Sequence, residues 1–351
     1  MTKILKNHID KEELKIKLAQ DKTQRTTISF YRYVKIEKPE ELRDDLFQQW
    51  QNLGVMGRIY LADEGINAQL SLPTENIEKF RSELYQDERF DKTPFKIAIE
   101  DDGKSFYKLC IKVREKIVAD GLDDESFNPS DVGKHLDAKQ FNKFLEEGAI
   151  VVDMRNHYES EVGHFEGAIC PDVDTFREEL PMVEEILKEK KNQKVLLYCT
   201  GGIRCEKASA YFKHKGFTDV NQLHGGIIDY KKQVDAENLE CKFRGKNFVF
   251  DERMGERISE EIISHCHQCE KASDEHTNCK NDACHLLFIQ CKNCKVKFKG
   301  CCTAKCQEIN TLPEKEQKEL RRNAAKDDCL SVYKSRLRPK LGEILEERGV
   351  R

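Results

Sequence analysis

The sequence contains no uninterrupted apolar stretch of about 18 residues, the length that a helix needs to cross a bilayer. It also lacks internal repeats and low-complexity tracts, and its N-terminus has no apolar segment long enough for a secretory signal. Charged residues make up 35% of the chain, and the mean hydropathy is −0.72. We therefore expect a cytoplasmic protein with no membrane partner.

The chain also lacks an excess of positive charge, because its formal net charge is −4. This balance argues against a uniformly basic nucleic-acid-binding protein, although it says nothing about local patches. Any contact with RNA is therefore expected to be regional.

Cysteine, in contrast, is abundant, with 15 among 351 residues. In a secreted chain this number suggests disulfides, but in a reducing compartment cysteines more often bind metal or take part in chemistry. Their uneven placement along the chain favours the second interpretation.

At 351 residues the chain is too long for one ordinary core, and we expect two or three folded units. The first shows the order strand, helix, strand, strand, helix, strand, which predicts an α+β domain of the split-βαβ, ferredoxin-like type. In the second, helices and strands alternate, which predicts an α/β domain with a parallel sheet covered on both faces. The expected units are an N-terminal arm at 1–25, a ferredoxin-like domain at 26–118, a polar linker at 119–136, a parallel-sheet domain at 137–240, a cysteine-rich region at 241–310 that opens with a hairpin at 241–251, and a charged helical tail at 311–351.

Residues 199–205 read CTGGIRC and follow an apolar strand predicted at 194–198, with a helix expected at 205–215. A cysteine at the end of a buried strand, before a glycine turn and a helix, points its sulfur toward backbone N–H groups, which favours the thiolate. We therefore take Cys199 as the candidate catalytic residue. Arg204 adds a positive charge that lowers the pKa of the thiol and helps to bind an anion. The residues of the supporting loop are Thr200, Gly201, Gly202, Ile203 and Arg204.

Asp153 and Arg155 follow another predicted strand, at 149–153, whose carboxyl end meets the same edge of the parallel sheet as Cys199. The Asp153 carboxylate is expected to orient the loop arginine or to cap a turn, and Arg155 to line the pocket. Cys205 either resolves an oxidised Cys199 or packs in the first helical turn, and packing is favoured.

The third region holds nine cysteines within 41 residues, at 266–306. Pairs separated by two residues are typical of zinc sites, because this gap lets both sulfurs reach one tetrahedral ion. We expect one or two structural zinc ions, with a pairing that the sequence does not reveal. An iron–sulfur cluster and a disulfide-linked knot are the alternatives. The candidate ligands are Cys266, Cys269, Cys279, Cys284, Cys291, Cys294, Cys302 and Cys306.

RNA contact requires positive charge and planar groups for unstacked bases. Alternation at i, i+2 places basic residues on one face of a strand predicted at 106–113, and residues 331–340 contain no acid. The candidate RNA-binding residues, more credible as a group than singly, are Arg58, Lys108, Lys112, Arg114, Arg336 and Arg338.

Four motifs together resemble the rhodanese domain. In chain order they are VVDMR at 151–155, GHFEGA at 163–168, CTGGIR at 199–204 and LHGG at 223–226. With a split-βαβ domain before them and a cysteine-rich region behind, the chain resembles the bacterial rhodanese-family tRNA wobble-uridine hydroxylases. Two further segments are similar to that family, ADEGINA at 62–68 and HCHQC at 265–269.

This resemblance implies a rhodanese-like central domain and an oxygen-dependent hydroxylation of the wobble uridine at C5, which gives 5-hydroxyuridine in tRNA. It implies Cys199 as the essential cysteine, Arg204 as the arginine that closes the loop, and Asp153 with Arg155 as the pair at the strand end. The implied partner is the tRNA anticodon stem-loop, and the implied co-substrate is molecular oxygen. No flavin or haem and no obligatory protein partner are expected.

Two other functions fit parts of the sequence. A sulfurtransferase would carry a persulfide on Cys199, and the loop alone fits that activity, but a simple thiosulfate enzyme does not require the flanking domains. A noncatalytic RNA-binding module stabilised by zinc would need no reactive cysteine at all.

Overall fold

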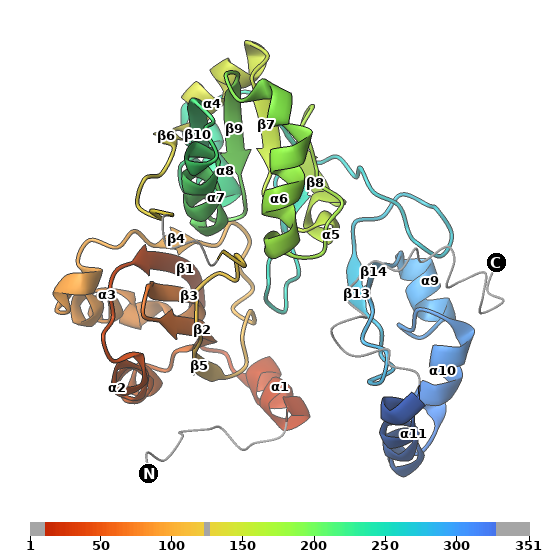
Figure 1. Cartoon of the computed structure of the whole chain (residues 1–351). Helices are drawn as coiled ribbons and strands as arrows, with labels where there is room; N and C mark the ends of the chain where they lie inside the picture. The colour runs from red at the N-terminus through yellow and green to blue at the C-terminus, as the bar shows by residue number, and fades with distance from the viewer. Residues whose placement is uncertain (1–10, 123–126, 328–351) are drawn as a thin grey trace.

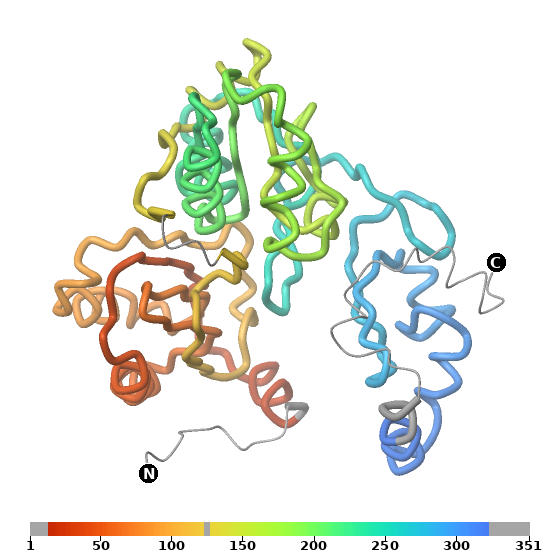
Figure 2. Tube along the Cα trace, viewed as in Figure 1, coloured from red at the N-terminus to blue at the C-terminus, as the bar shows by residue number. Residues whose placement is uncertain are grey.

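The computed structural model describes residues 11–122 and 127–327, and it shows three regions (Figure 1). The N-terminal domain lies at the lower left of the view, the central domain above it, and the C-terminal region to the right. The trace in Figure 2 shows that the chain passes from the first to the second through residues near 120 and then into the third. None of the described helices is long and apolar enough to cross a membrane.

The N-terminal domain is a five-stranded sheet with the order β4-β1-β3-β2-β5. Its first four strands are antiparallel, and β5 adds to β2 in parallel. This order confirms the expected split-βαβ fold and the extension of its sheet. The elements are α1 (Lys11–Gln20), β1 (Arg25–Tyr33), α2 (Pro39–Asn52), β2 (Met56–Ala62), β3 (Gly65–Pro73), a 3₁₀ turn (Thr74–Asn76), α3 (Ile77–Tyr85), a second 3₁₀ turn (Glu88–Phe90), β4 (Lys96–Ile97) and β5 (Leu109–Val113).

The two faces of this sheet differ in character. Ile28 and Phe30 of β1 are buried in the core with Trp50 and Phe80, which come from the covering helices α2 and α3. Because side chains alternate along a strand, the intervening residues of β1 point to the opposite face. That face is polar and is turned toward the central domain.

The central domain contains a parallel sheet with the order β6-β10-β9-β7, which confirms the expected α/β architecture. Apolar clusters cover both of its faces. The structure differs from the prediction at β6. This strand lies at the end of the segment that was expected to be a linker, and it pairs with β10. The elements are β6 (Lys134–Leu136), α4 (Ala138–Glu146), β7 (Ile150–Asp153), α5 (His157–Ser160), β8 (Gly163–Phe165), α6 (Phe176–Ile186), a 3₁₀ turn (Lys188–Lys190), β9 (Lys194–Tyr198), α7 (Ile203–His214), β10 (Asp219–Leu223) and α8 (Gly226–Glu237).

The C-terminal region has little regular structure. The hairpin expected at 241–251 is wrong, because β11 instead pairs with β8 of the central domain and with β12. The free edge of β8 offers a partner that the sequence pattern could not show. The elements are β11 (Phe243–Asn247), β12 (Glu256–Arg257), β13 (His276–Asn278), β14 (Leu287–Ile289), α9 (Lys292–Lys297), α10 (Ala304–Thr311) and α11 (Glu314–Asp327). Helix α11 lies within the expected helical tail, of which residues 328–351 are outside the described residues.

Candidate functional site

Cys199 lies at the carboxyl end of β9, directly before the turn that leads into α7. It is 1% exposed, and the backbone N–H of Gly202 donates a hydrogen bond to its sulfur at 3.1 Å. Gly202 has a φ of +97°, a conformation that L-residues rarely adopt, and a Cβ there would lie 3.0 Å from the Tyr31 hydroxyl. This turn lets α7 begin at Ile203, two residues before the helix start expected from the sequence.

The surroundings of Cys199 lower the pKa of its thiol to about 6. Burial raises the pKa, but hydrogen bonds from Cys205 and the positive charge of Arg204 outweigh that effect. Burial and the neighbouring Cys199 raise the pKa of Cys205 well above its ordinary value. Cys199 is therefore the thiolate and Cys205 the thiol. Cys205 packs in the core of the domain and also hydrogen-bonds to the Cys199 sulfur.

Arg204 is held by a carboxylate that the sequence analysis did not single out. Its guanidinium makes two hydrogen bonds to Glu159, at 2.6 and 2.9 Å, and Glu159 is fully buried. This two-point contact fixes the plane of the guanidinium beside the loop. The only hint in the sequence is that Glu159 stands three residues after Asn156, the spacing of the capping box that begins α5.

Asp153 and Arg155 have a different place from the one expected. They bind each other through two hydrogen bonds of 2.8 and 2.6 Å, and both are fully buried. Asp153 also accepts a hydrogen bond from Tyr198 at 2.7 Å, while Arg155 donates to the Gly163 carbonyl at 2.6 Å. Asp153 therefore does not orient Arg204, and Arg155 is not among the residues that line the cavity. The pair instead ties β7 to the ends of β9 and β8.

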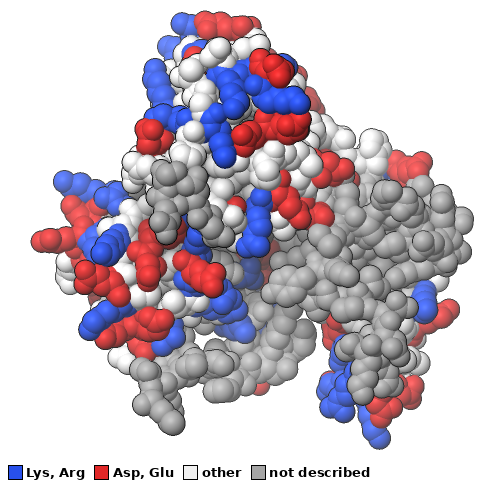
Figure 3. Space-filling model, viewed as in Figure 1, with Lys and Arg blue, Asp and Glu red and all other residues white. Residues whose placement is uncertain are grey.

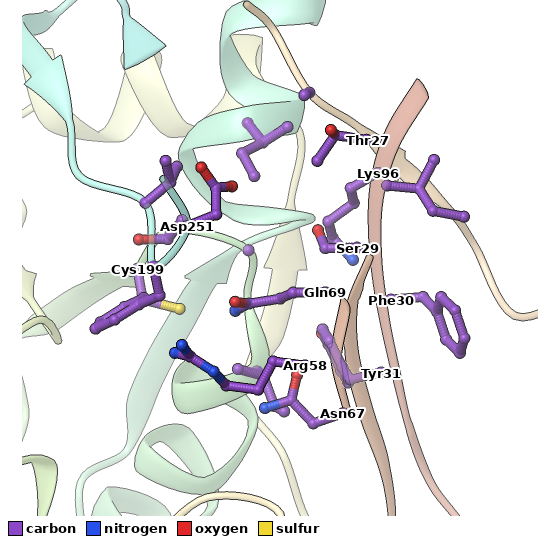
Figure 4. Close-up of a pocket in the computed structure, with 18 of the residues that line it drawn as sticks. Thr27, Ser29, Phe30, Tyr31, Arg58, Asn67, Gln69, Lys96, Cys199 and Asp251 are labelled. Atoms are coloured by element: carbon purple, nitrogen blue, oxygen red, sulfur yellow. The ribbon is translucent and has the colours of Figure 1, made fainter. Parts of the chain in front are cut away.

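A cavity of about 360 Å³ lies in front of Cys199 (Figure 4). Thr200, Gly201, Ile203 and Arg204 of the loop form one wall. The polar face of the N-terminal sheet forms the opposite wall, and a segment after β11 closes a third side. The residues that this segment and the sheet contribute include Thr27, Ser29, Tyr31, Arg58, Tyr60, Asn67, Gln69, Lys96, Val249, Phe250, Asp251, Arg253 and Glu256.

Polar contacts dock the N-terminal domain onto the loop and α7. The Tyr31 hydroxyl donates to Glu206 at 3.0 Å, and the Tyr33 hydroxyl donates to the Ile203 carbonyl at 3.2 Å. Lys207, which is 2% exposed, binds Glu64 at 2.7 Å and also binds Asp120. The site is thus built between two domains. This position between two domains was not predicted from the sequence, although the alternation of polar residues along β1 was a usable signal.

A second groove, of about 410 Å³, continues from this cavity and shares Arg58 and Phe250 with it. Three of the expected RNA-binding residues, Arg58, Lys108 and Lys112, line it, together with the aromatic side chains Tyr107, Tyr158 and Phe248. Arg114 is not among its lining residues and instead stands over the Tyr60 ring at 5.8 Å. Arg336 and Arg338 lie outside the described residues. Positive and negative side chains are interspersed on the face shown in Figure 3.

The structure gathers the eight candidate metal ligands into two groups of four. One group is Cys266, Cys269, Cys291 and Cys294, and the other is Cys279, Cys284, Cys302 and Cys306, with the sulfurs of each within 4.8 Å of one another. Neighbouring sulfurs such as those of Cys284 and Cys302 are 3.6 Å apart. Tetrahedral Zn–S bonds of about 2.3 Å imply sulfur separations of about 3.8 Å, so the donor set fits such an ion. The fourteen described cysteines are all free thiols.

Family models match three consecutive parts of the chain. The UPF0176 acylphosphatase-like domain matches residues 25–117, the rhodanese-like domain matches residues 137–233, and the rhodanese C-terminal domain matches residues 244–307. A solved rhodanese-like domain protein from Staphylococcus aureus is 22% identical and covers 28% of this chain and 90% of its own, with a TM-score of 0.24.

Curated relatives match almost the whole chain. A protein of Leptospira interrogans named tRNA uridine(34) hydroxylase is 55% identical over 97% of this chain and 93% of its own. A protein of Photorhabdus laumondii with the same name is 53% identical over 95% of this chain and 96% of its own. At this identity and coverage, the chain belongs to the tRNA uridine(34) hydroxylase family.

Proposed function

We propose that this protein hydroxylates the wobble uridine of tRNA at C5 to give 5-hydroxyuridine, with Cys199 as the catalytic residue and molecular oxygen as the co-substrate. The observation that carries the proposal is an ionised sulfur at the wall of a cavity of about 360 Å³, in a chain of this family. Cavities of a few hundred cubic ångströms are the size that small organic groups occupy. A protein that acts on tRNA would work in the cytoplasm.

The thiolate of Cys199 can make uracil C5 reactive. Addition of the sulfur to C6 forms an S–C6 bond and moves the C5=C6 electron pair toward C5 and the O4 carbonyl. C5 then attacks one oxygen of a peroxide, which forms from molecular oxygen with two electrons and two protons from an external reductant. The O–O bond breaks, the other oxygen leaves as water, and loss of the C5 proton and of the sulfur restores the double bond. In a second route the same peroxide oxidises the Cys199 thiolate to the sulfenic acid and its other oxygen leaves as water. C5 then attacks the sulfenic oxygen, the S–O bond breaks, and the thiolate is restored as C5 loses its proton. In either route Arg204 and the Gly202 N–H hold the sulfur in place.

The groove that continues from the cavity supports the anticodon stem-loop as the partner. Recognition of single-stranded RNA combines positive charge along the backbone with aromatic surfaces on which bases stack. Lys108 and Lys112 supply the charge, and the half-buried Tyr107 and Tyr158 supply the rings. An enzyme that modifies a base takes it out of the stack into a pocket, and here the groove leads to Cys199.

We further propose that each group of four cysteines holds one structural zinc ion. Four thiolates complete a tetrahedral site and leave no open position for substrate, which is the arrangement of structural rather than catalytic zinc. Around the second group, the buried core consists mostly of the cysteines themselves, with Leu286 and Phe288. Metal binding would therefore supply folding energy that the apolar core does not.

The test is nucleoside mass spectrometry of tRNA from cells that lack the gene and carry either the wild-type protein or the Cys199→Ser variant. We expect 5-hydroxyuridine with the wild type and none with Cys199→Ser, while both proteins bind an anticodon stem-loop RNA equally. Cys241→Ser is the matched control, since this half-buried thiol lies outside the cavity and should leave the product unchanged. A fully active Cys199→Ser variant would contradict the role of the sulfur. Rapid formation of thiocyanate from thiosulfate and cyanide would instead support the sulfurtransferase.

A further inference from the structure

A row of four polar side chains crosses the N-terminal sheet opposite Cys199. The register places Lys96 beside Ser29, Ser29 beside Gln69, and Gln69 beside Arg58, so the row spans β4, β1, β3 and β2. All four residues line the cavity, and Figure 4 shows Gln69 and Arg58 reaching toward the Cys199 side. Since neighbouring strands are about 4.8 Å apart, the row is about 14 Å long, enough to face a base and part of its sugar–phosphate.

Lys96 has an unusual environment for a lysine. Its side chain is 4% exposed as a whole, but the ammonium nitrogen itself is open to the cavity, and it makes no hydrogen bond to residues 11–122 or 127–327. Its Nζ stands 4.7 Å from the centre of the Tyr31 ring, and a Cβ on Gly201 would lie 3.7 Å from its Cδ. The side chain is thus packed against the catalytic loop while its charged end faces the cavity.

An ammonium group that opens into a cavity and has no acceptor from the protein can donate only to water or to a ligand there, so its placement points to a ligand that supplies the acceptor. Asp229 and Cys199 act on Lys96 only through their charges, because neither is within hydrogen-bond distance. Burial lowers the pKa of Lys96, as expected for an ammonium group removed from water.

The chemistry of the row distinguishes the two pyrimidines. Lysine and arginine side chains donate hydrogen bonds and accept none, whereas the amide of Gln69 does both. Uracil offers two carbonyl acceptors flanking an N–H donor. Cytosine offers one carbonyl acceptor, and an amino donor stands in place of the second. A donor together with an amide therefore suits the adjacent carbonyl and N–H groups of uracil, while the far end of the row can face the sugar–phosphate.

We propose that this row is the base-recognition wall of the site and that Lys96 is a specificity-determining residue, which donates a hydrogen bond to the O4 carbonyl of the uracil. This inference rests on the proposed function. The same hydrogen bond stabilises the negative charge that reaches O4 when the Cys199 sulfur adds to C6. The N-terminal domain would then select the base that the central domain modifies.

The experiment measures the affinity of the full-length protein for two anticodon stem-loop RNAs that differ only in having uridine or cytidine at the wobble position. Wild type should prefer the uridine RNA. Lys96→Met, which keeps the length of the side chain but removes the donor, should reduce affinity for the uridine RNA about tenfold, the effect of one charged hydrogen bond, and leave the cytidine RNA unchanged. Lys96→Arg should retain the preference. Lys79→Met, at an exposed lysine of α3, is the control for loss of one charge from this domain.

A Lys96→Met variant that keeps the full preference for uridine would overturn the inference. Because a change at a buried residue can disturb folding, Gln69→Leu is a second variant at a half-buried position, and it should also reduce the preference. A Gln69→Leu variant with an unchanged preference would equally count against the wall. If wild type binds both RNAs equally, only this inference fails. If wild type binds neither, the proposed function fails with it.

Discussion

The ionisation of Cys199 depends on the cation beside it, and replacing that cation gives a quantitative test. The perturbation is the double variant Arg204→Met with Glu159→Gln. Arg204→Met alone would leave the fully buried Glu159 without its partner, which typically costs about 3 to 5 kcal/mol of stability. Changing both residues removes the positive charge without leaving an unpaired buried carboxylate.

The expected size of the effect follows from the pKa of about 6 in the wild type. At pH 7 about 90% of Cys199 is then thiolate, against about 3% for a thiol with the ordinary pKa of about 8.5. We take this second value as the limit for the variant, since the hydrogen bonds from Cys205 and the backbone remain and continue to lower the pKa. The less acidic thiolate is intrinsically more nucleophilic by about 13-fold over this range. At pH 7 the two effects nearly cancel and leave the variant about twofold slower. At pH 5.5 the thiolate fractions differ by about 240-fold at that limit, so the variant should react more slowly by up to about 18-fold.

The assay is the rate of iodoacetamide labelling of the peptide that contains Cys199, followed by mass spectrometry between pH 5 and pH 9. The rate for the wild type should rise with a midpoint of about 6, and the midpoint for the double variant should lie well above it. The matched control is Arg244→Met with Glu166→Gln, which removes an exposed pair of the same kind at 2.6 Å. A wild-type midpoint of 8 or more, or an unchanged midpoint in the Arg204 variant, would refute the reasoning.

Two further predictions concern the metal sites and the docking of the domains. Elemental analysis should find two zinc ions per chain; Cys302→Ser should lose one of them, whereas Cys301→Ser, which lies outside both groups of four, should keep both. A content of iron and sulfide would instead support the iron–sulfur alternative. Lys207→Met should lower the free energy of unfolding by about 3 kcal/mol, because it breaks a buried contact with Asp120. Lys213→Met, which removes a more exposed pair from the same helix, should cost less than about 1 kcal/mol. Urea unfolding followed by far-ultraviolet circular dichroism measures both, since α7 carries both lysines, and equal losses would contradict the role of Lys207.

The parts of the site that the sequence could predict are those carried by one continuous segment. The strand, turn and helix around Cys199 are read from residues 194–215, because the apolar run and the glycines are adjacent in sequence. The eight cysteines could be selected in the same way, since a gap of two residues is a local property. Their grouping was beyond the sequence, because the pair at 266 and 269 closes a site with the pair at 291 and 294, across cysteines that belong to the other group.

The parts that could not be predicted depend on contacts between distant segments. Glu159 binds Arg204 across 45 residues, and the register of β4 with β1 sets Lys96 beside Ser29 across 67 residues. Similarly, β11 pairs with β8 rather than with its own neighbours. In each case the residue types near the contact are compatible with several partners, and only the tertiary structure shows which partner is used. Asp153 is the opposite case. Its position at a strand end suggested a contact with the Cys199 loop, but the structure pairs it with Arg155, two residues away in sequence.

The two domains contribute different parts of the site, because the central domain forms only one wall of the cavity. Its loop supplies a thiolate and a fixed arginine, but these alone have no means of distinguishing one substrate from another. The N-terminal sheet covers the loop, with Tyr31 against Gly202 and Lys96 against Gly201, and adds the polar wall that faces Cys199. The segment after β11 completes the cavity and extends it into the basic, aromatic groove. Because the cavity exists only when these parts are docked, changes at the Lys207 contact should alter the site as well as the stability of the protein.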